Sequence, residues 1–273
     1  MALIAISRGS LTAAERLAQA LGEKTGSRIV SREEVIRAAE RYGIGRTGTD
    51  GADFEAESLP PSRENRSAVR RHYLACFKAA LLDFAAREPL IYHGNLAHVL
   101  LNDVPFVLRV RVNAPRRDRI GMLMAERGYD RERAAVEIAE ADRRRRRWVQ
   151  FLYDTADIAP VLFDLVIDMS EITLDEAVRR VSSRIRKSPF RRTGESVSKL
   201  FDLRLAACAE VRLLEALPAL GSEWQVEARS AAGLVTVRIP QPAAGGDSLE
   251  AEVRNALRDM QGLNRVTVAK VSP

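Results

Sequence analysis

The opening of the chain places a glycine between an apolar strand pattern and a helical pattern, which is a position suited to binding phosphate. The stretch AISRGSLTAAERLAQALG puts Gly9 at this turn. A phosphate-binding loop closes backbone N–H groups around an anion, and adds a lysine and a hydroxyl that holds magnesium. Setting the pattern G-x-x-x-x-G-K-S/T on that glycine places Ala14, Glu15 and Arg16 where glycine, lysine and the hydroxyl belong.

Glu15 weakens this turn as an ATP site. One contact between unit charges at ~4 Å and an effective dielectric constant of about 20 is worth on the order of 4 kcal/mol, and a carboxylate repels the phosphate that lysine attracts. The helix N-terminus, with Ser10 and Thr12 as caps, could still hold an anion more weakly. The candidates for binding the donor phosphate are Gly9, Ser10, Thr12 and Arg16.

Two histidines follow another strand pattern, in YHGNLAH at residues 92–98. Open α/β sheets bind ligands where strands end, and His93 and His98 could donate hydrogen bonds to a phosphate there. A third ligand at suitable spacing is missing, so the sequence predicts no metal-ligating residues.

A run of arginines in EADRRRRRWVQFLY is the most distinctive charged patch. On a helix Arg143 and Arg147 share one face, and Arg144 lies on another. Guanidinium groups stabilise phosphoryl oxygens, although five consecutive arginines cannot all face one ligand. A solvated basic helix or an RNA-binding patch is the alternative interpretation. Arg116 and Arg119, in APRRDR, offer further cations, which a helix-start surface explains as well.

The composition indicates a globular protein with an anionic partner. The 273 residues are 46% hydrophobic and 29% charged, with a net charge of +6 and a pI of about 9.7. This balance suits a nucleotide, a nucleic acid or a phospholipid surface, or reflects arginine-rich solvated helices. Cys76 and Cys208 lie in apolar helical patterns and are expected to be buried thiols. No stretch approaches the ~20 apolar residues of a spanning helix, so we expect a cytoplasmic protein.

Strand and helix signals alternate over the first two thirds of the chain and would position these residues. Ser31 and Glu34 predict a capping box at the start of the second helix. The alternation is typical of an α/β fold, with a parallel sheet covered by helices on both faces. We predict strands over 2–7, 28–30, 89–94, 106–114 and 162–170, with an exposed loop over 45–62.

The pattern changes after residue 187. Residues 188–200 are mostly polar and basic and include proline and glycine, which is typical of a linker. Beyond them a helix, two alternating strands, a helix and a last strand predict a small α+β module of about 70 residues. The predicted organisation is a domain over 1–187, a linker over 188–200 and an α+β domain over 201–273.

Several blocks, in order, resemble the cytidylate kinase-like family of P-loop kinases over residues 2–185. They include SREEVIRAAERYGI, LIYHGNLAHVLL, VLRVRVNAPRRDRI and DRRRRRWVQFLYD. The resemblance implies a P-loop kinase-like fold, nucleotide binding and transfer of a phosphoryl group from ATP–Mg²⁺ to a nucleoside monophosphate such as CMP. The family usually has Gly-Gly-Lys or Gly-Gly-Arg where Ala13, Ala14 and Glu15 stand, so this chain departs from it at the ATP loop. The C-terminal module resembles a BON domain, which implies a phospholipid or protein ligand.

The resemblance also implies roles for individual residues. It places Asp142–Arg147 in a mobile lid whose arginines grip the transferring phosphoryl group. It places Ser31 and Arg32 where the acceptor nucleotide enters, and residues 92–98 beside its phosphate. A plain capping box with a solvent-facing arginine accounts for Ser31 and Arg32 equally well. The catalytic candidates are Arg143, Arg144 and Arg147, and the acceptor-binding candidates are Ser31, Arg32, His93 and Asn95.

Three functional hypotheses follow. The first is a kinase-like transferase that uses Mg²⁺ with ATP through a degenerate loop. The second is an inactive regulatory protein that binds a nucleotide or another anion and engages a lipid or protein through its C-terminal module. The third is a basic protein that associates with RNA, although aromatic residues at 5% offer few stacking platforms for nucleic acid.

Overall fold

The computed structural model describes residues 3–8, 11–44, 63–94, 100–153, 163–218, 224–240 and 246–271. Its contacts divide the chain into two compact units, each built from two separate segments. The first unit contains Met1–Glu34 and Arg87–Arg192, and the second contains Val35–Ala86 and Thr193–Pro273. The predicted loop over 45–62 lies outside the described residues.

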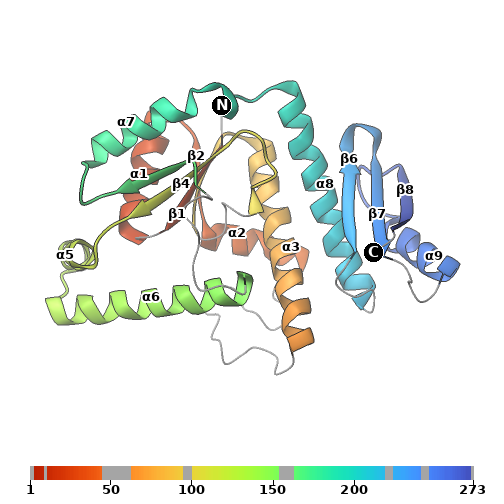
Figure 1. Cartoon of the computed structure of the whole chain (residues 1–273), viewed down its shortest axis with the longest axis horizontal. Helices are drawn as coiled ribbons and strands as arrows, with labels where there is room; N and C mark the ends of the chain where they lie inside the picture. The colour runs from red at the N-terminus through yellow and green to blue at the C-terminus, as the bar shows by residue number, and fades with distance from the viewer. Residues whose placement is uncertain are drawn as a thin grey trace. The chain divides into compact units, whose positions relative to one another are not determined.

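The first unit is built on a parallel sheet (Figure 1). The sheet has five strands in the order β2-β3-β1-β4-β5, and every neighbouring pair is parallel, as predicted. All residues of β3 are buried, which is typical of a parallel strand covered on both faces. The strands are β1 (Leu3–Arg8), β2 (Arg28–Ser31), β3 (Leu90–Gly94), β4 (Val107–Asn113) and β5 (Leu165–Asp168).

Apolar side chains of two helices form the core of this unit against the sheet. Leu17 of helix α1 and Val181 of helix α7 are fully buried with Val110 of β4 in one cluster. Alternation along β4 explains the contact, because Leu108, Val110 and Val112 share the buried face. The helices of the unit are α1 (Leu11–Thr25), α5 (Arg116–Arg127), α6 (Arg131–Tyr153) and α7 (Leu174–Ile185).

The predicted capping box at the end of β2 is confirmed. The Ser31 backbone N–H donates to the Glu34 carboxylate at 3.0 Å, and the Glu34 N–H donates to Ser31 Oγ at 3.2 Å. These bonds satisfy two amide groups at the start of helix α2 (Arg32–Ala39) and fix its position directly after the strand.

The second unit contains a mixed three-stranded sheet packed against helices. The strands β6 (Gln225–Arg229), β7 (Leu234–Pro240) and β8 (Arg265–Val271) lie in that order, with β6 antiparallel and β8 parallel to β7. Helices α8 (Gly194–Ala216) and α9 (Gly246–Leu257) bury Leu213 and Leu257 in one cluster with Val235, Val237 and Trp224. The predicted order of helix, two strands, helix and strand is confirmed.

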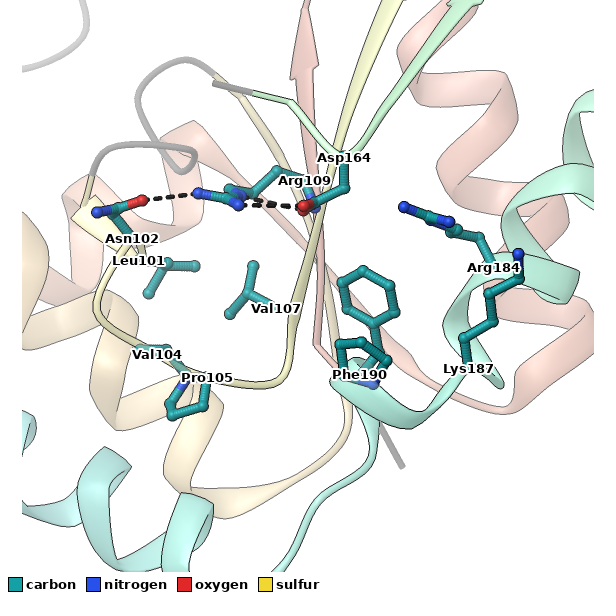
Figure 2. A pocket seen from close by; sticks show the side chains of 11 residues that line it. Leu101, Asn102, Val104, Pro105, Val107, Arg109, Asp164, Arg184, Lys187 and Phe190 are labelled. Carbon is teal, nitrogen blue, oxygen red and sulfur yellow. Dashed lines mark hydrogen bonds and ion pairs between the residues drawn. The ribbon is translucent and has the colours of Figure 1, made fainter. Parts of the chain in front are cut away.

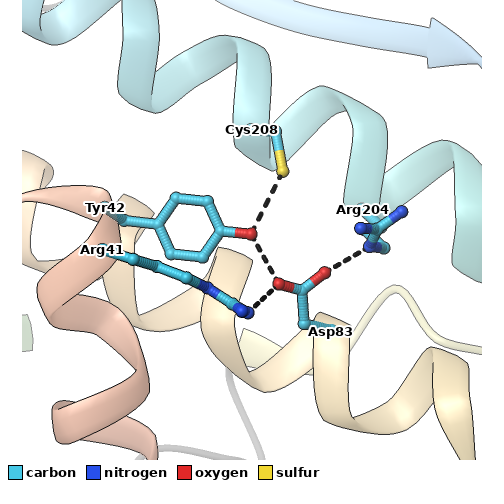
Figure 3. Close-up of polar contacts among 5 residues, drawn as sticks. All are labelled: Arg41, Tyr42, Asp83, Arg204 and Cys208. Carbon is cyan, nitrogen blue, oxygen red and sulfur yellow. Dashed lines mark hydrogen bonds and ion pairs between the residues drawn. The ribbon is translucent and has the colours of Figure 1, made fainter. Parts of the chain in front are cut away.

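A buried carboxylate joins three helical segments of the second unit (Figure 3). Asp83, on α3 (Arg63–Arg87), is only 4% exposed and binds Arg41 and Arg204, while the Tyr42 hydroxyl donates to it at 2.6 Å. Burial, and then the hydrogen bond to Asp83, raises the pKa of the Tyr42 phenol. Burial also raises the pKa of the Cys208 thiol, which lies 3.7 Å from the Tyr42 oxygen. The network therefore ties η1 (Glu40–Tyr42) and α3 to α8.

The segment predicted as a linker has a regular structure. Residues Ser188–Phe190 form a short 3-10 helix, η5, and the Phe190 ring is buried in the core of the first unit. Helix α8 begins at Gly194, well before the predicted start at residue 201, because Thr193 and Ser196 form a capping box.

Candidate functional site

Polar residues and one glycine gather where the parallel strands of the first unit end. In the sheet register Ser7 of β1 lies opposite Gly94 of β3 on one side and Arg111 of β4 on the other. Ser31 of β2 lies opposite His93 of β3. Ligands of open parallel sheets bind at this carboxyl edge, so the edge is the candidate functional site.

Helix α1 begins early for a phosphate-binding loop that starts at Gly9. Strand β1 extends to Arg8, and the chain is helical from Leu11 to Thr25. The side chains of Ala13 and Ala14 are buried in the core, within the first turn of α1. The positions that would wrap around a phosphate in the six-residue spacing of the motif are therefore already helical. Gly9 and Ser10 lie outside the described residues.

The side chains at the start of α1 do not suit the binding of ATP together with magnesium. Glu15 is half-buried at the lysine position, and Arg16, which is exposed, stands where the hydroxyl ligand of magnesium belongs. The Thr12 hydroxyl donates instead to the Glu126 carboxylate of α5, at 3.4 Å. What remains is the N-terminus of α1, whose first turn has no acidic residue and whose free N–H groups favour an anion.

The acceptor-binding candidates Ser31, Arg32 and His93 are brought together by the pairing of β2 with β3. His93 is 8% exposed and lies in register with Ser31, while Arg32 follows directly as the first residue of α2. A Cβ atom on Gly94 would lie 3.1 Å from the Arg32 Cβ atom and would overlap the Tyr92 hydroxyl. Glycine at this position therefore leaves space for both side chains. Asn95 and His98 lie outside the described residues.

The lid arginines inferred from the resemblance are exposed on α6. Arg143, Arg144 and Arg147 all point to solvent. Arg144 lies 3.7 Å from Glu140 and 4.0 Å from Glu137, contacts within the helix that are weak at a surface. Their catalytic role stays a prediction.

Other arginines of the same region converge on one carboxylate. The Arg119 guanidinium of α5 donates two hydrogen bonds to Asp142 of α6, at 2.8 and 2.6 Å, and Arg145 lies 3.7 Å from the same carboxylate. The charges of Arg111 and Arg146 also act on Arg145. We call Arg111, Arg119, Arg145, Arg146 and Asp142 the arginine cluster. Four guanidinium groups and one carboxylate leave it strongly positive.

The protonation of the cluster reflects this crowding. Burial alone would raise the pKa of Asp142, but the hydrogen bonds and charge of Arg119, with the charges of Arg145 and Arg146, hold it below its usual range. Burial lowers the pKa of Arg145; Asp142 opposes this, and the charges of Arg119, Arg111 and Arg146 lower it further. A bound anion would replace repulsion among these cations with attraction.

The sequence did not reveal which arginines form the cluster. The sequence offers Arg119 as a further cation after a strand end, which a helix-start surface explains as well, and it places Arg111 in a strand. The i, i+3 spacing of Asp142 and Arg145 was the available signal, because such pairs share one helix face. The sequence does not distinguish this face of α6 from the face of Arg143 and Arg147, because the difference depends on where α5 packs.

Two searches of the described residues were negative. No group of His, Cys, Asp and Glu in this part of the chain has an arrangement that could hold a metal ion. No helix among the residues that the structure places combines the length and apolar character of a membrane span.

The five-stranded parallel sheet with its helices defines the class of the chain as an α/β protein, with an additional C-terminal mixed sheet. The model of the cytidylate kinase-like family matches residues 3–171, and the chain belongs to this family. A search of curated proteins detects no relative.

Solved structures resemble the first two thirds of the chain. An uncharacterized protein from Eubacterium ventriosum matches with a TM-score of 0.50 and 17% identity, over 67% of this chain and 97% of that one. Shikimate kinase from Bacteroides thetaiotaomicron matches with a TM-score of 0.39 and 15% identity, over 68% and 100%. Dephospho-CoA kinase from Campylobacter jejuni matches with a TM-score of 0.32 and 10% identity, over 68% and 98%. At these identities the likeness to the Eubacterium protein concerns the fold alone.

Proposed function

We propose that the chain binds a nucleotide phosphate at the carboxyl edge of its parallel sheet, and that it acts as a nucleotide-binding regulatory protein of the cytidylate kinase-like family. The observation that carries the proposal is the arginine cluster, in which two partly buried guanidinium groups, those of Arg119 and Arg145, contact a single carboxylate, Asp142. Such a surplus of positive charge at a strand edge suits a phosphoryl group.

The sheet register supports this location. Ser7 of β1 and Arg111 of β4 are register partners in the sheet. Strand β1 extends to Arg8, and α1 begins at Leu11. The anion-favouring N-terminus of α1 and the cationic end of β4 therefore belong to the same edge. Contact between Thr12 of α1 and Glu126 of α5 brings the helix that carries Arg119 to the same side.

The turn and its side chains argue against efficient use of ATP. Residues from Leu11 onward are already helical and cannot form the open loop that encloses a triphosphate, and Glu15 and Arg16 replace the lysine and the magnesium ligand. A ligand with fewer phosphates, such as CMP, needs neither group. We therefore expect a nucleoside monophosphate to bind in a magnesium-independent way.

Titration calorimetry on the full chain tests the proposal, with CMP, inorganic pyrophosphate and ATP as ligands, each with and without magnesium. Arg119→Gln and Arg145→Gln should each weaken CMP binding by about tenfold, the loss of one charge-assisted contact. Arg117→Gln is the matched control, because Arg117 lies on the same helix and its side chain is 80% exposed. Absence of heat with all three ligands, or equal affinities in the variants and the control, would overturn the proposal.

Phosphotransfer is the second candidate, favoured by membership in a kinase-like family. In it Arg143, Arg144 and Arg147 would swing onto the transferring group as a lid, while Ser31, Arg32, His93 and Asn95 hold the acceptor. Gly9, Ser10, Thr12 and Arg16 would hold the donor. An assay for ADP released from ATP–Mg²⁺ in the presence of CMP distinguishes the two candidates. ADP release that is abolished in the Arg143→Gln variant would establish phosphotransfer. CMP binding without ADP release would support the nucleotide-binding regulatory protein.

The C-terminal sheet is proposed to be a BON-like ligand-binding module. The support is its order of helix, two strands, helix and strand, with α8 and α9 packed on the mixed sheet. Sedimentation of the full chain with vesicles of anionic phosphatidylglycerol, compared with neutral phosphatidylcholine, tests a phospholipid ligand. Pelleting with neither vesicle would remove the lipid and leave a protein partner as the remaining proposal.

A further inference from the structure

A cavity opens at the opposite edge of the parallel sheet (Figure 2). Val107 and Arg109 at the start of β4 line it, together with Asp164 just before β5 and residues that follow α7. Arg109 of the cavity lies two positions before Arg111 of the arginine cluster on β4, about 7 Å along the strand. The cavity lining shares no residue with the arginine cluster.

One charged pair in the cavity is already satisfied. The Arg109 guanidinium donates to both Asp164 oxygens at 3.0 Å and to the Asn102 side-chain oxygen at 2.6 Å, and the Arg109 backbone N–H also donates to Asp164. Burial would raise the pKa of Asp164, but these bonds and the Arg109 charge hold it below its usual range. The pair therefore adds no net charge to the cavity wall, because the Arg109 cation balances the Asp164 carboxylate.

Two further cations line the cavity, and one of them, Arg184, also acts by its charge on Asp164. Arg184 and Lys187 extend from the end of α7 beside Phe190, as Figure 2 shows. The Arg184 Nε atom is buried and has no hydrogen-bond partner in the structure, although its guanidinium lies 5.8 Å from the centre of the Phe190 ring. No ion pair of Lys187 is found among the described residues. Arg184 and Lys187 are the cationic side chains that an anion in the cavity would contact.

The rest of the lining is apolar. Leu101, Val104, Val107 and Phe190 are each less than a tenth exposed, and Pro105 and Pro189 complete the wall. The volume is about 290 Å³. An apolar cavity of about 150 Å³ accepts benzene, so this one has room for a ring-sized body and a small head group. Apolar walls with a few convergent polar groups are typical of small-molecule sites.

We propose that this cavity binds a small amphipathic anion, whose carboxylate or phosphate contacts Arg184 and Lys187 and whose apolar body lies against Phe190 and Val107. The net charge of the lining is positive, because the Arg109–Asp164 pair cancels and two cations remain. The proposal is independent of the nucleotide site.

The test uses phenyl phosphate, benzoate, inorganic phosphate and uncharged benzyl alcohol as probes of the isotopically labelled full chain by NMR. Phenyl phosphate or benzoate should shift the amide signals of residues 101–109 and 184–190, and the stronger of the two identifies the head group. Inorganic phosphate should bind these residues more weakly, since it lacks the apolar body, and benzyl alcohol should bind more weakly still. Shifts confined to α5 and α6, or none, would overturn the proposal.

Variants make the test specific. Arg184→Gln combined with Lys187→Gln should weaken binding of the preferred probe by at least about tenfold, as expected for two charge-assisted contacts. Arg186→Gln is the matched control, because Arg186 is exposed at the end of the same helix and does not line the cavity. Arg119→Gln should leave this binding unchanged. Equal binding by the double variant and the Arg186 control would refute the assignment.

Discussion

Asp142 is the one carboxylate of the arginine cluster. It also joins two helices, because it lies on α6 and accepts hydrogen bonds from Arg119 of α5. Its contacts with Arg119 and Arg145 are partly buried, with exposed fractions of 18% for Asp142 and 12% for Arg119. At this burial a hydrogen-bonded pair contributes more than a surface ion pair does. The same contacts orient the guanidinium groups, so that binding and stability share these side chains.

The first prediction concerns the pH dependence of this pair. Because the folded-state pKa of Asp142 is lowered, the pair stabilises the fold above the unfolded carboxyl pKa of about 4 and loses this contribution as the pH falls below it. Arg119→Gln should lower the free energy of unfolding by about 1–3 kcal/mol at neutral pH. Urea unfolding at neutral and acidic pH measures the difference, which should shrink in acid. A difference that stays constant or grows in acid would contradict the prediction, and Arg117→Gln is again the control.

The second prediction concerns Gly94. Adding a methyl group there would overlap the Tyr92 hydroxyl and crowd Arg32. Gly94→Ala should therefore lower the free energy of unfolding by about 1–3 kcal/mol, the usual effect of overpacking. Gly121→Ala is the control, because nothing lies within 4 Å of its added Cβ and it sits inside α5, where alanine is favoured by up to about 1 kcal/mol. Chemical denaturation measures the free energy of unfolding of both variants. A Gly94→Ala variant as stable as the original protein would contradict the predicted clash.

At the scale of elements, the strand patterns were the most predictable part of the fold. The strands predicted over 89–94 and 106–114 are observed as Leu90–Gly94 and Val107–Asn113, within one residue at each end, because their apolar patterns have little interruption. The start of α8 was missed because Thr193 and Ser196 lie in a polar stretch with glycine, where a capping box and a linker have similar compositions. The face of α6 that carries Arg145 was missed because helical spacing gives relative positions and not the side that a neighbour covers.

The early start of α1 leads to a third prediction. Glu15 lies one turn inside the helix, close to the anion-favouring N-terminus. Glu15→Lys should raise the affinity for inorganic pyrophosphate by up to about tenfold, and Glu15→Gln by less, because the first reverses a half-buried charge and the second removes it. Neither should create efficient transfer from ATP, since the helix still begins at Leu11. Calorimetry that shows equal affinity in all three proteins would contradict placement of the anion at this helix end.

At the scale of the whole molecule, the two units do not follow the order of the sequence. Val35–Ala86 clusters with Thr193–Pro273, whereas the predicted division places it in the first domain. Single-residue patterns do not show this, because the contacts join positions far apart in the chain. Arg71 of α3, for example, donates to Glu210 at 3.1 Å and to the Trp224 carbonyl at 2.8 Å, and its guanidinium lies 3.9 Å from the Trp224 ring centre.

These contacts predict that residues 1–187 do not reach full stability alone. Removing the rest deletes Arg204, which binds the buried Asp83, and exposes Asp83 to water with fewer partners. Loss of such contacts costs about 3 kcal/mol or more, which lowers the melting temperature by roughly 6–12 °C. In the full chain Arg204→Gln should cause a smaller decrease, and Arg212→Gln, at an exposed position of the same helix, should cause almost none. Thermal unfolding by circular dichroism measures all four proteins. Cooperative melting of residues 1–187 at the temperature of the full chain would instead establish that segment as an independently folding domain.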